Sequence, residues 1–226
     1  MAFKWQVGRN LLGRSPDPLV LSGDVFDINM FDPKEHENTN ILAVKMNELH
    51  LYYLMCEDER GADAVYRLFT QHKEEDMFHG SYHYDLIHGQ AAVVCYGIAR
   101  KKRRRKYLKY AKKCQKHIKF IGQQGNTHFL YMDQLIDGEV AALKGRTEDA
   151  KKCYEKAISL AARTGLINEQ SVAQERFGDY MLECGDTNEA EYRWKNAMGL
   201  CTEWGAQAKV DQLRRKLASL RGTSDE

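Results

Sequence analysis

The sequence predicts an all-α protein in which antiparallel helix pairs stack as a short α-solenoid. Three observations predict this fold class. A pattern of glycine, alanine, an aromatic residue and alanine occurs twice in the C-terminal half, forty residues apart. All three prolines fall within the first 33 residues, so the rest of the chain is free to form long helices. Runs that alternate between apolar and polar residues, which are typical of strands, are scarce.

The two copies of the pattern have identical offsets: twelve residues from glycine to alanine, four to the aromatic residue and three to the last alanine. A glycine in the first helix of a pair lets the second helix approach closely. The other three positions then share one face of that second helix. Such a pair buries its apolar face by stacking on further pairs. The structural repeat positions are Gly138, Ala150, Tyr154 and Ala157 in the first copy and Gly178, Ala190, Trp194 and Ala197 in the second.

The chain divides into three parts. Residues 1–36 are predicted to be an irregular N-terminal segment with short helices, one over Trp5–Leu12 and a second over Val20–Met30. The sequence Ser15-Pro16-Asp17-Pro18 separates them, because proline interrupts a helix. Residues 37–220 form the helical repeat domain. Residues 221–226, which are small or charged, are predicted to be a disordered tail.

Apolar residues at three- and four-residue spacing predict the helices of the repeat domain. The first begins near Asn40 and ends at a turn over Glu59-Arg60-Gly61. Gly145, Gly185 and Gly205 stand where later helices end in left-handed caps. Short turns make consecutive helices antiparallel neighbours. The remaining helices are predicted over Ala62–His72, 82–99, Lys102–Ile121, Phe129–Leu143, Thr147–Arg163, Asn168–Cys184, Thr187–Glu203 and Ala206–Leu220.

Composition indicates the compartment. Hydrophobic residues make up 43% and charged residues 29% of the chain, which is ordinary for a soluble protein. The six cysteines are scattered without a Cys-x-x-Cys motif, which favours reduced thiols. The start, MAFKWQVGRN, lacks the apolar core of a signal peptide, and no apolar run reaches transmembrane length. We therefore expect a cytoplasmic protein without a transmembrane segment, with the nucleus as the alternative location.

Positive charge is concentrated in one stretch. Seven consecutive basic residues are followed by lysines at helical spacing, and no acidic residue occurs from Leu86 to Met132. This pattern predicts a docking surface for an acidic partner, nucleic acid or anionic lipid, or a nuclear-import signal. The alternative is a solvated turn and helix face that acidic neighbours compensate. Tyr107 and Tyr110 have core spacing, which argues against nucleic acid. The candidate partner-binding residues are Arg100, Lys101, Lys102, Arg103, Arg104, Arg105, Lys106, Lys109 and Lys113.

No pattern predicts a catalytic, cofactor or metal site. Residues 8–15 fit a phosphate loop only loosely, because Arg14 replaces the lysine and Pro16 follows. His79, His83 and His88 resemble metal ligands in spacing, but three histidines near a helix start are more often surface or packing residues. We therefore expect that these 226 residues are not an enzyme and bind no cofactor.

The Gly-Ala-aromatic-Ala spacing resembles the tetratricopeptide repeat (TPR), although its period is forty residues. The region from Glu139 to Leu213 resembles the helical region that follows the AAA-type ATPase module in large multidomain signalling proteins with kinase, GAF or histidine-kinase domains. The most specific element is the segment from Trp204 and Gly205 through Val210 to Leu213. The resemblance implies a TPR-like region without the nucleotide-binding module, which would lie outside this chain.

Together these features predict a non-catalytic protein–protein interaction and scaffold module of a signalling protein, with an unknown protein partner. The partner would lie on a concave surface formed by the first helix of each pair. Two alternatives stay open. The chain is a C-terminal regulatory remnant of an ATPase-coupled signal-transduction kinase, or it binds acidic partners or nucleic acid through the basic helix at 100–119.

Overall fold

The computed structural model describes residues 2–72 and 81–222. This part of the chain is all helical apart from turns and one isolated β-bridge, which confirms the predicted all-α class. It contains ten α-helices and four short 3-10 turns. The helices are α1 (Ala2–Leu11), α2 (Asn38–Leu54), α3 (Asp58–Gln71), α4 (Tyr82–Lys101), α5 (Leu108–Gln123), α6 (Leu130–Leu143), α7 (Thr147–Arg163), α8 (Ile167–Glu183), α9 (Thr187–Trp204) and α10 (Gln207–Gly222).

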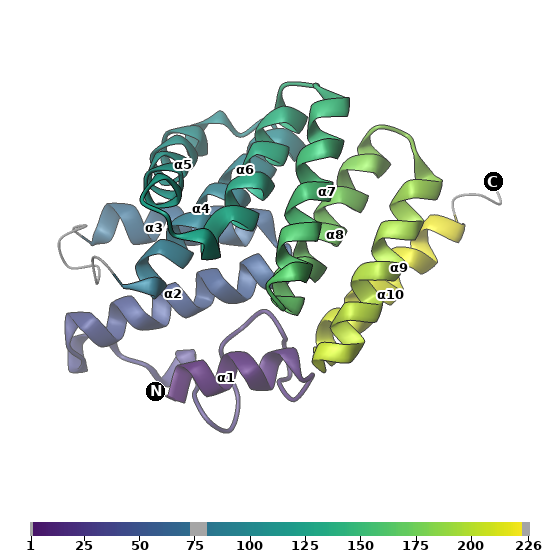
Figure 1. Cartoon of the computed structure of the whole chain (residues 1–226). Helices are drawn as coiled ribbons and strands as arrows, with labels where there is room; N and C mark the ends of the chain where they lie inside the picture. Colours follow the sequence, from purple (N-terminus) through teal and green to yellow (C-terminus); the bar gives the residue numbers. More distant parts are fainter. Residues whose placement is uncertain (1, 73–80, 223–226) are drawn as a thin grey trace.

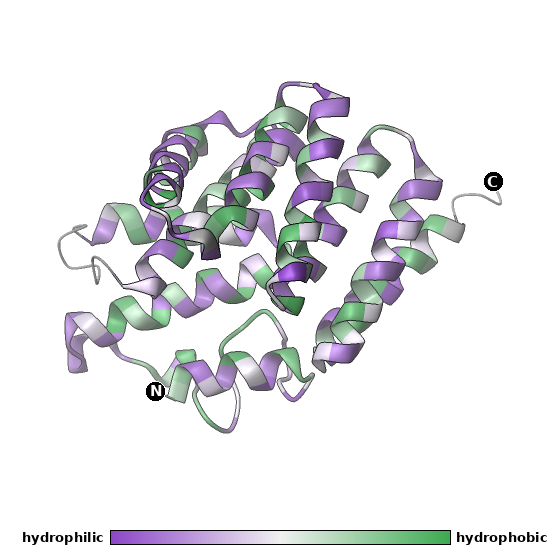
Figure 2. Ribbon diagram, in the orientation of Figure 1, coloured by the Kyte–Doolittle hydropathy of each residue, from purple (hydrophilic) through white to green (hydrophobic). Residues whose placement is uncertain are grey.

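Helices that follow one another in the chain pack side by side, from α2 through to α10 (Figure 1). Helix α1 runs along the lower edge of the molecule in Figure 1. It contacts α2, which follows it in the chain, and also α10 at the other end of the chain. Apolar side chains from all ten helices form one continuous core, and in Figure 2 hydrophilic and hydrophobic residues alternate around helices such as α5 and α7. No helix of the described residues is long and apolar enough to cross a membrane.

The repeated pattern corresponds to a repeated contact. A Cβ atom added to Gly138 of α6 would lie 3.1 Å from the ring of Tyr154 in α7. A Cβ atom added to Gly178 of α8 would lie 2.6 Å from the ring of Trp194 in α9. Both rings are buried. The two glycines therefore allow each aromatic side chain to lie directly on the backbone of the preceding helix.

The N-terminal segment differs from its prediction at 20–30, where the structure has a loop and a 3-10 turn (η1, Ile28–Met30) in place of a helix. Two buried polar side chains of α1 hold this loop. Gln6 Oε1 accepts a hydrogen bond from the Phe26 backbone N–H at 3.2 Å, and Asn10 Nδ2 donates to the Val20 carbonyl at 2.5 Å. These bonds satisfy loop backbone groups that a helix would have paired internally.

The first turn of the repeat domain also differs from its prediction. Glu59-Arg60-Gly61 lies inside α3, and the chain turns at 55–57 instead. Cys56 takes a left-handed conformation there, with φ +55°, which glycine usually supplies. Gly61 serves a different purpose: a Cβ atom at this position would lie 3.1 Å from Val94 of α4, so the glycine allows α3 and α4 to approach closely.

The basic run does not lie in one long helix. Arg100 and Lys101 end α4, Arg103 takes φ +52°, and a 3-10 turn (η4, Arg105–Tyr107) precedes α5. Tyr107 is fully buried and closes this turn. The predicted helix over Lys102–Ile121 therefore begins at Leu108. At the other end of the chain, α10 continues to Gly222, two residues beyond the boundary predicted for the repeat domain.

Candidate functional site

The most unusual feature of the interior is a network of ion pairs, here called the buried network. At its centre the Arg176 guanidinium of α8 has no exposed side-chain surface. Its Nη2 lies 2.6 Å from Asp58 Oδ1 in α3, and its Nη1 lies 3.2 Å from Glu139 Oε1 in α6. Both carboxylates are buried as well. One arginine thus joins three helices that are far apart in sequence.

The network continues toward α10. The Glu175 carboxylate oxygens lie 2.5 Å from Lys209 Nζ and 2.7 Å from Lys216 Nζ. Lys216 Nζ also lies 2.8 Å from Asp179 Oδ1. The same Asp179 oxygen accepts a hydrogen bond from Trp194 Nε1 at 3.0 Å. The aromatic residue of the second repeat is therefore tied directly to the buried network.

Neighbouring cations favour the ionised forms of Asp58 and Glu175. Burial alone would raise the pKa of Asp58, but Arg176 and Lys101 outweigh that effect and lower it. The pKa of Glu175 is lowered for the same reason, with burial outweighed by Lys209 and Lys216. In turn Glu175 and Asp179 raise the pKa of Lys216 above its usual value, although burial opposes this.

Two of the candidate partner-binding residues belong to this network, which corrects their assignment. The side chain of Arg100 is 5% exposed and pairs with Glu139 at 3.2 Å and with Glu183. The Lys101 ammonium lies 3.1 Å from Asp58 and 2.9 Å from Asp179. Both residues therefore link helices. Arg100 has almost no surface to offer a partner, whereas the Lys101 side chain is still 25% exposed.

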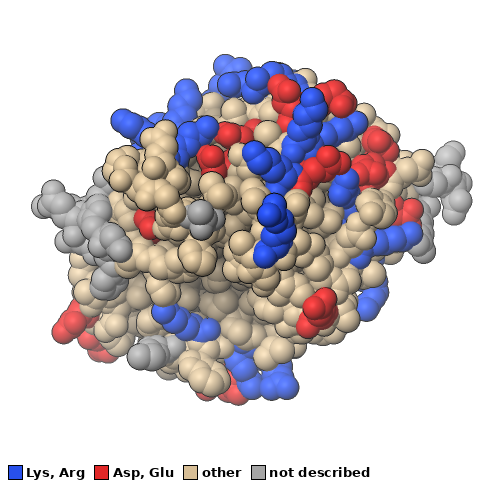
Figure 3. Space-filling view, viewed as in Figure 1, with Lys and Arg blue, Asp and Glu red and all other residues tan. Residues whose placement is uncertain are grey.

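The rest of the basic run lies on the outside, over the α4–α5 loop and one face of α5. Lys102 and Arg104 both pair with Glu59 of α3, whose side chain is 39% exposed. In Figure 3 lysine and arginine side chains gather at the upper edge of the molecule, with acidic side chains among them. The exposed residues, here called the basic surface, are Lys102, Arg103, Arg104, Arg105, Lys106, Lys109, Lys112, Lys113 and Lys116.

Aromatic side chains support the basic surface from below. Tyr107 is 0% and Tyr110 is 7% exposed, so neither ring is available for stacking on a base. Lys106 Nζ lies 4.6 Å from the Tyr107 ring centroid, and Lys109 Nζ lies 4.7 Å from that of Tyr110. Phe120, in contrast, is 58% exposed at the other end of α5. The surface therefore offers cations and some apolar area, and Tyr66 of α3, which is 46% exposed, lies with its ring centroid 5.8 Å from Lys106 Nζ.

The helix α8, which was predicted to contribute to a concave docking surface, is covered by other segments of the chain. Twelve of the 17 residues of α8 are buried, including acidic and basic ones. Across this region the Tyr53 hydroxyl of α2 donates to Glu169 Oε2 of α8 at 2.5 Å. Gln212 of α10 donates to Glu57, next to α3, at 3.1 Å. A peptide lying against α8 would have to displace these contacts, so this face is not an open groove.

The histidine motif is divided by the fold. His79 lies outside the described residues. His83 is exposed with Nε2 3.2 Å from Lys4 Nζ, whereas His88 is buried with Nδ1 2.8 Å from the Tyr84 carbonyl oxygen. Among the described residues, no group of three histidine, cysteine, aspartate or glutamate side chains is placed to hold a metal ion. The loosely matching phosphate loop over 8–15 begins inside α1, where it has no preceding strand.

Sequence reasoning did not single out Asp58, Glu139, Glu175, Arg176 or Asp179. One signal was present: α8 carries charged residues at nearly every turn among apolar ones, which is unusual for a helix exposed on one side. The partners could not be read from this signal, because Asp58 and Arg176 are 118 positions apart.

The buried carboxyl group of Glu169 is expected to make the stability of the protein depend on pH near neutrality. Burial raises the pKa of this carboxyl to about 7, although hydrogen bonding to Tyr53 and Tyr131 opposes the shift. The folded protein binds the Glu169 proton more tightly than the unfolded chain does. Protonation of Glu169 therefore stabilises the fold fully below about pH 4.5, and this stabilisation is lost as the pH rises through about 7. Glu169→Gln is therefore expected to raise the urea midpoint at pH 8 and to change it little at pH 5.

The matched control is Glu203→Gln, because Glu203 is exposed at the end of α9. We expect it to leave the midpoint unchanged at both pH values. An equal effect of Glu169→Gln at pH 5 and pH 8 would contradict the raised pKa.

Comparison with protein-family models, curated proteins and solved structures finds no match for this chain.

Proposed function

We propose that this chain is a TPR-like helical interaction module that binds an acidic segment of a partner protein through the basic surface. The supporting observation is the exposure of nine cations from Lys102 to Lys116, in a stretch that contains no acidic residue. The repeated glycine–aromatic contacts support the TPR-like part of the proposal. The scaffold role follows from the same arrangement, since stacked helices hold this surface rigidly.

Two observations favour a protein segment over nucleic acid. Tyr107 and Tyr110, which stand between the cations in the sequence, are buried, so neither ring can stack on a base. Acidic side chains also interrupt the positive surface: Glu59 pairs with Lys102 and Arg104, and Asp137 pairs with Lys119 at 3.1 Å. A long phosphate backbone would meet these acids repeatedly, whereas a short acidic segment can lie between them.

The test is binding of a fluorescent twenty-residue glutamate peptide, measured by anisotropy at several salt concentrations, beside a single-stranded oligonucleotide of the same length. The variant changes four exposed residues of the basic surface to serine: Arg103, Arg105, Lys109 and Lys112. We expect at least tenfold weaker peptide binding, because each lost cation removes part of a salt-dependent attraction.

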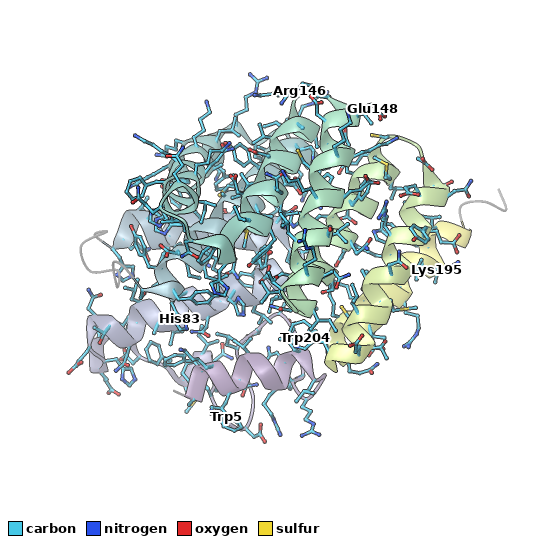
Figure 4. The ribbon with its side chains drawn as sticks, viewed as in Figure 1. Trp5, His83, Arg146, Glu148, Lys195 and Trp204 are labelled. Carbon is cyan, nitrogen blue, oxygen red and sulfur yellow. The ribbon has the colours of Figure 1, made fainter. Side chains whose placement is uncertain are left out.

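A matched control changes four exposed cations elsewhere to serine: Arg163, Lys195, Arg214 and Arg215. We expect it to bind the peptide within twofold of the parent. The proposal fails if both four-residue variants lose binding equally, or if the parent prefers the oligonucleotide. Figure 4 places Lys195 on α9, on the opposite side of the molecule from α5.

A further inference from the structure

We propose that the hollow between α1, α2 and α4 is a binding site for a small apolar carboxylate. Two adjoining cavities, of about 210 Å³ and about 390 Å³, share the lining residues Lys4, Met46, Asn47 and His83. Volumes of this size suit a small organic molecule. In Figure 4, His83 lies on the side of α1 that faces α2, whereas Trp5 lies on the opposite side of α1.

The inner part of the hollow is apolar. Val7 of α1, Met46 of α2 and Ile87 of α4 line the smaller cavity and are at most 7% exposed. Leu86 adds to the same wall. An alkyl or aromatic group placed here would leave water for an apolar surface, which favours binding.

The hollow contains two histidines and one lysine among its polar side chains. Gln90 Nε2 lies 2.8 Å from His50 Nδ1, so this amide donates to Nδ1 and the ring proton is carried by Nε2. Burial lowers the pKa of His50 to about 4, which keeps the ring neutral at pH 7. His50 lines the smaller cavity, so its neutral ring lies beside the apolar wall.

The second histidine has the opposite tautomer for an analogous reason. The Lys4 ammonium can only donate, and its Nζ lies 3.2 Å from His83 Nε2. His83 Nε2 is thus the acceptor, and Nδ1 carries the proton. Lys4 itself provides a positive charge at the edge of the hollow. The described residues that line the two cavities include no aspartate or glutamate. An ammonium group, two imidazole rings and an apolar wall together match a carboxylate with an apolar body.

The probe is octanoate, and octan-1-ol is the uncharged comparison of the same chain length. Binding to the whole chain is measured by titration calorimetry, and the His50 imidazole nitrogen resonances are followed by NMR. We expect octanoate to bind at least tenfold more tightly than octan-1-ol and to shift the His50 Nε2 resonance.

Two variants and one control test the location. Lys4→Met keeps the aliphatic stem and removes the charge, and we expect at least tenfold weaker octanoate binding. Ala43→Phe, which fills the larger cavity, is expected to abolish binding. Lys34→Met removes an exposed charge outside the hollow and is expected to bind within twofold of the parent.

The proposal is overturned if the parent does not bind octanoate, if octan-1-ol binds equally well, or if Lys4→Met and Lys34→Met behave alike. The first two comparisons and the Lys4 variant remain informative even if Ala43→Phe destabilises the fold. Retained binding in a folded Ala43→Phe protein would also overturn it.

Discussion

Replacing Arg176 by methionine is expected to lower the free energy of unfolding by about 3–5 kcal/mol, as removal of one partner from a buried ion pair typically does. The guanidinium pairs with Asp58 and Glu139, and all three side chains are buried. Without it, two carboxylates would stay in the interior with only part of their compensating charge. Urea unfolding at pH 7 measures the loss.

Two further variants show that the loss comes from pairing. Arg215→Met removes an exposed arginine of α10 and is expected to change stability by less than about 0.5 kcal/mol. Adding Asp58→Asn to Arg176→Met removes one of the orphaned charges, so we expect the double variant to be more stable than the sum of the single effects predicts. A loss below about 1 kcal/mol in Arg176→Met would show that the network is not held as the structure has it.

Gly178→Leu is expected to destabilise the protein by about 3 kcal/mol through overpacking. Even a Cβ atom at this position would lie 2.6 Å from the Trp194 ring and 3.1 Å from the Ala190 carbonyl oxygen. The ring cannot move without lengthening its 3.0 Å hydrogen bond to Asp179. The change therefore disturbs the repeat contact and the buried network together. Thermal unfolding of the variant measures the effect.

The same substitution at Gly199 is the matched control. Gly199 lies in the interior of α9, is exposed, and has open space where a Cβ atom would be. Since leucine favours a helix more than glycine does, Gly199→Leu is expected to stabilise the protein by up to about 1 kcal/mol. If Gly178→Leu also raised the unfolding temperature, the proposed close approach of α8 and α9 would be wrong.

The regular part of the fold could be predicted closely. The helix at Thr147–Arg163 has the bounds that the apolar spacing indicates. The observed bounds of the neighbouring helices differ from the predicted ones by one or two residues at most of their ends. The predictions failed where tertiary contacts override local preference. Cys56 forms a turn without glycine, and the Gln6 and Asn10 side chains hold the segment at 20–30 as a loop.

The candidate interaction surface was only partly predictable. The sequence identifies a cluster of positive charge between Arg100 and Lys116, but it does not separate the cations that face a partner from those that hold the fold. Arg100 and Lys101 are directly followed by exposed residues of the same type. Their different role depends on Glu139, Asp58 and Asp179, which come from other helices.

The sequence by itself determined the helical class, the glycine–aromatic repeat and the location of the positive charge, because each depends on residues within one or two helices of each other. The tertiary structure alone decided which charges are buried and that α8 is covered by other segments of the chain. It also decided that polar side chains from α1, α2 and α4 line one hollow. The physical reason is distance along the chain. Ion pairs such as Asp58–Arg176 join residues 118 positions apart, and only the packing of intervening helices brings them together.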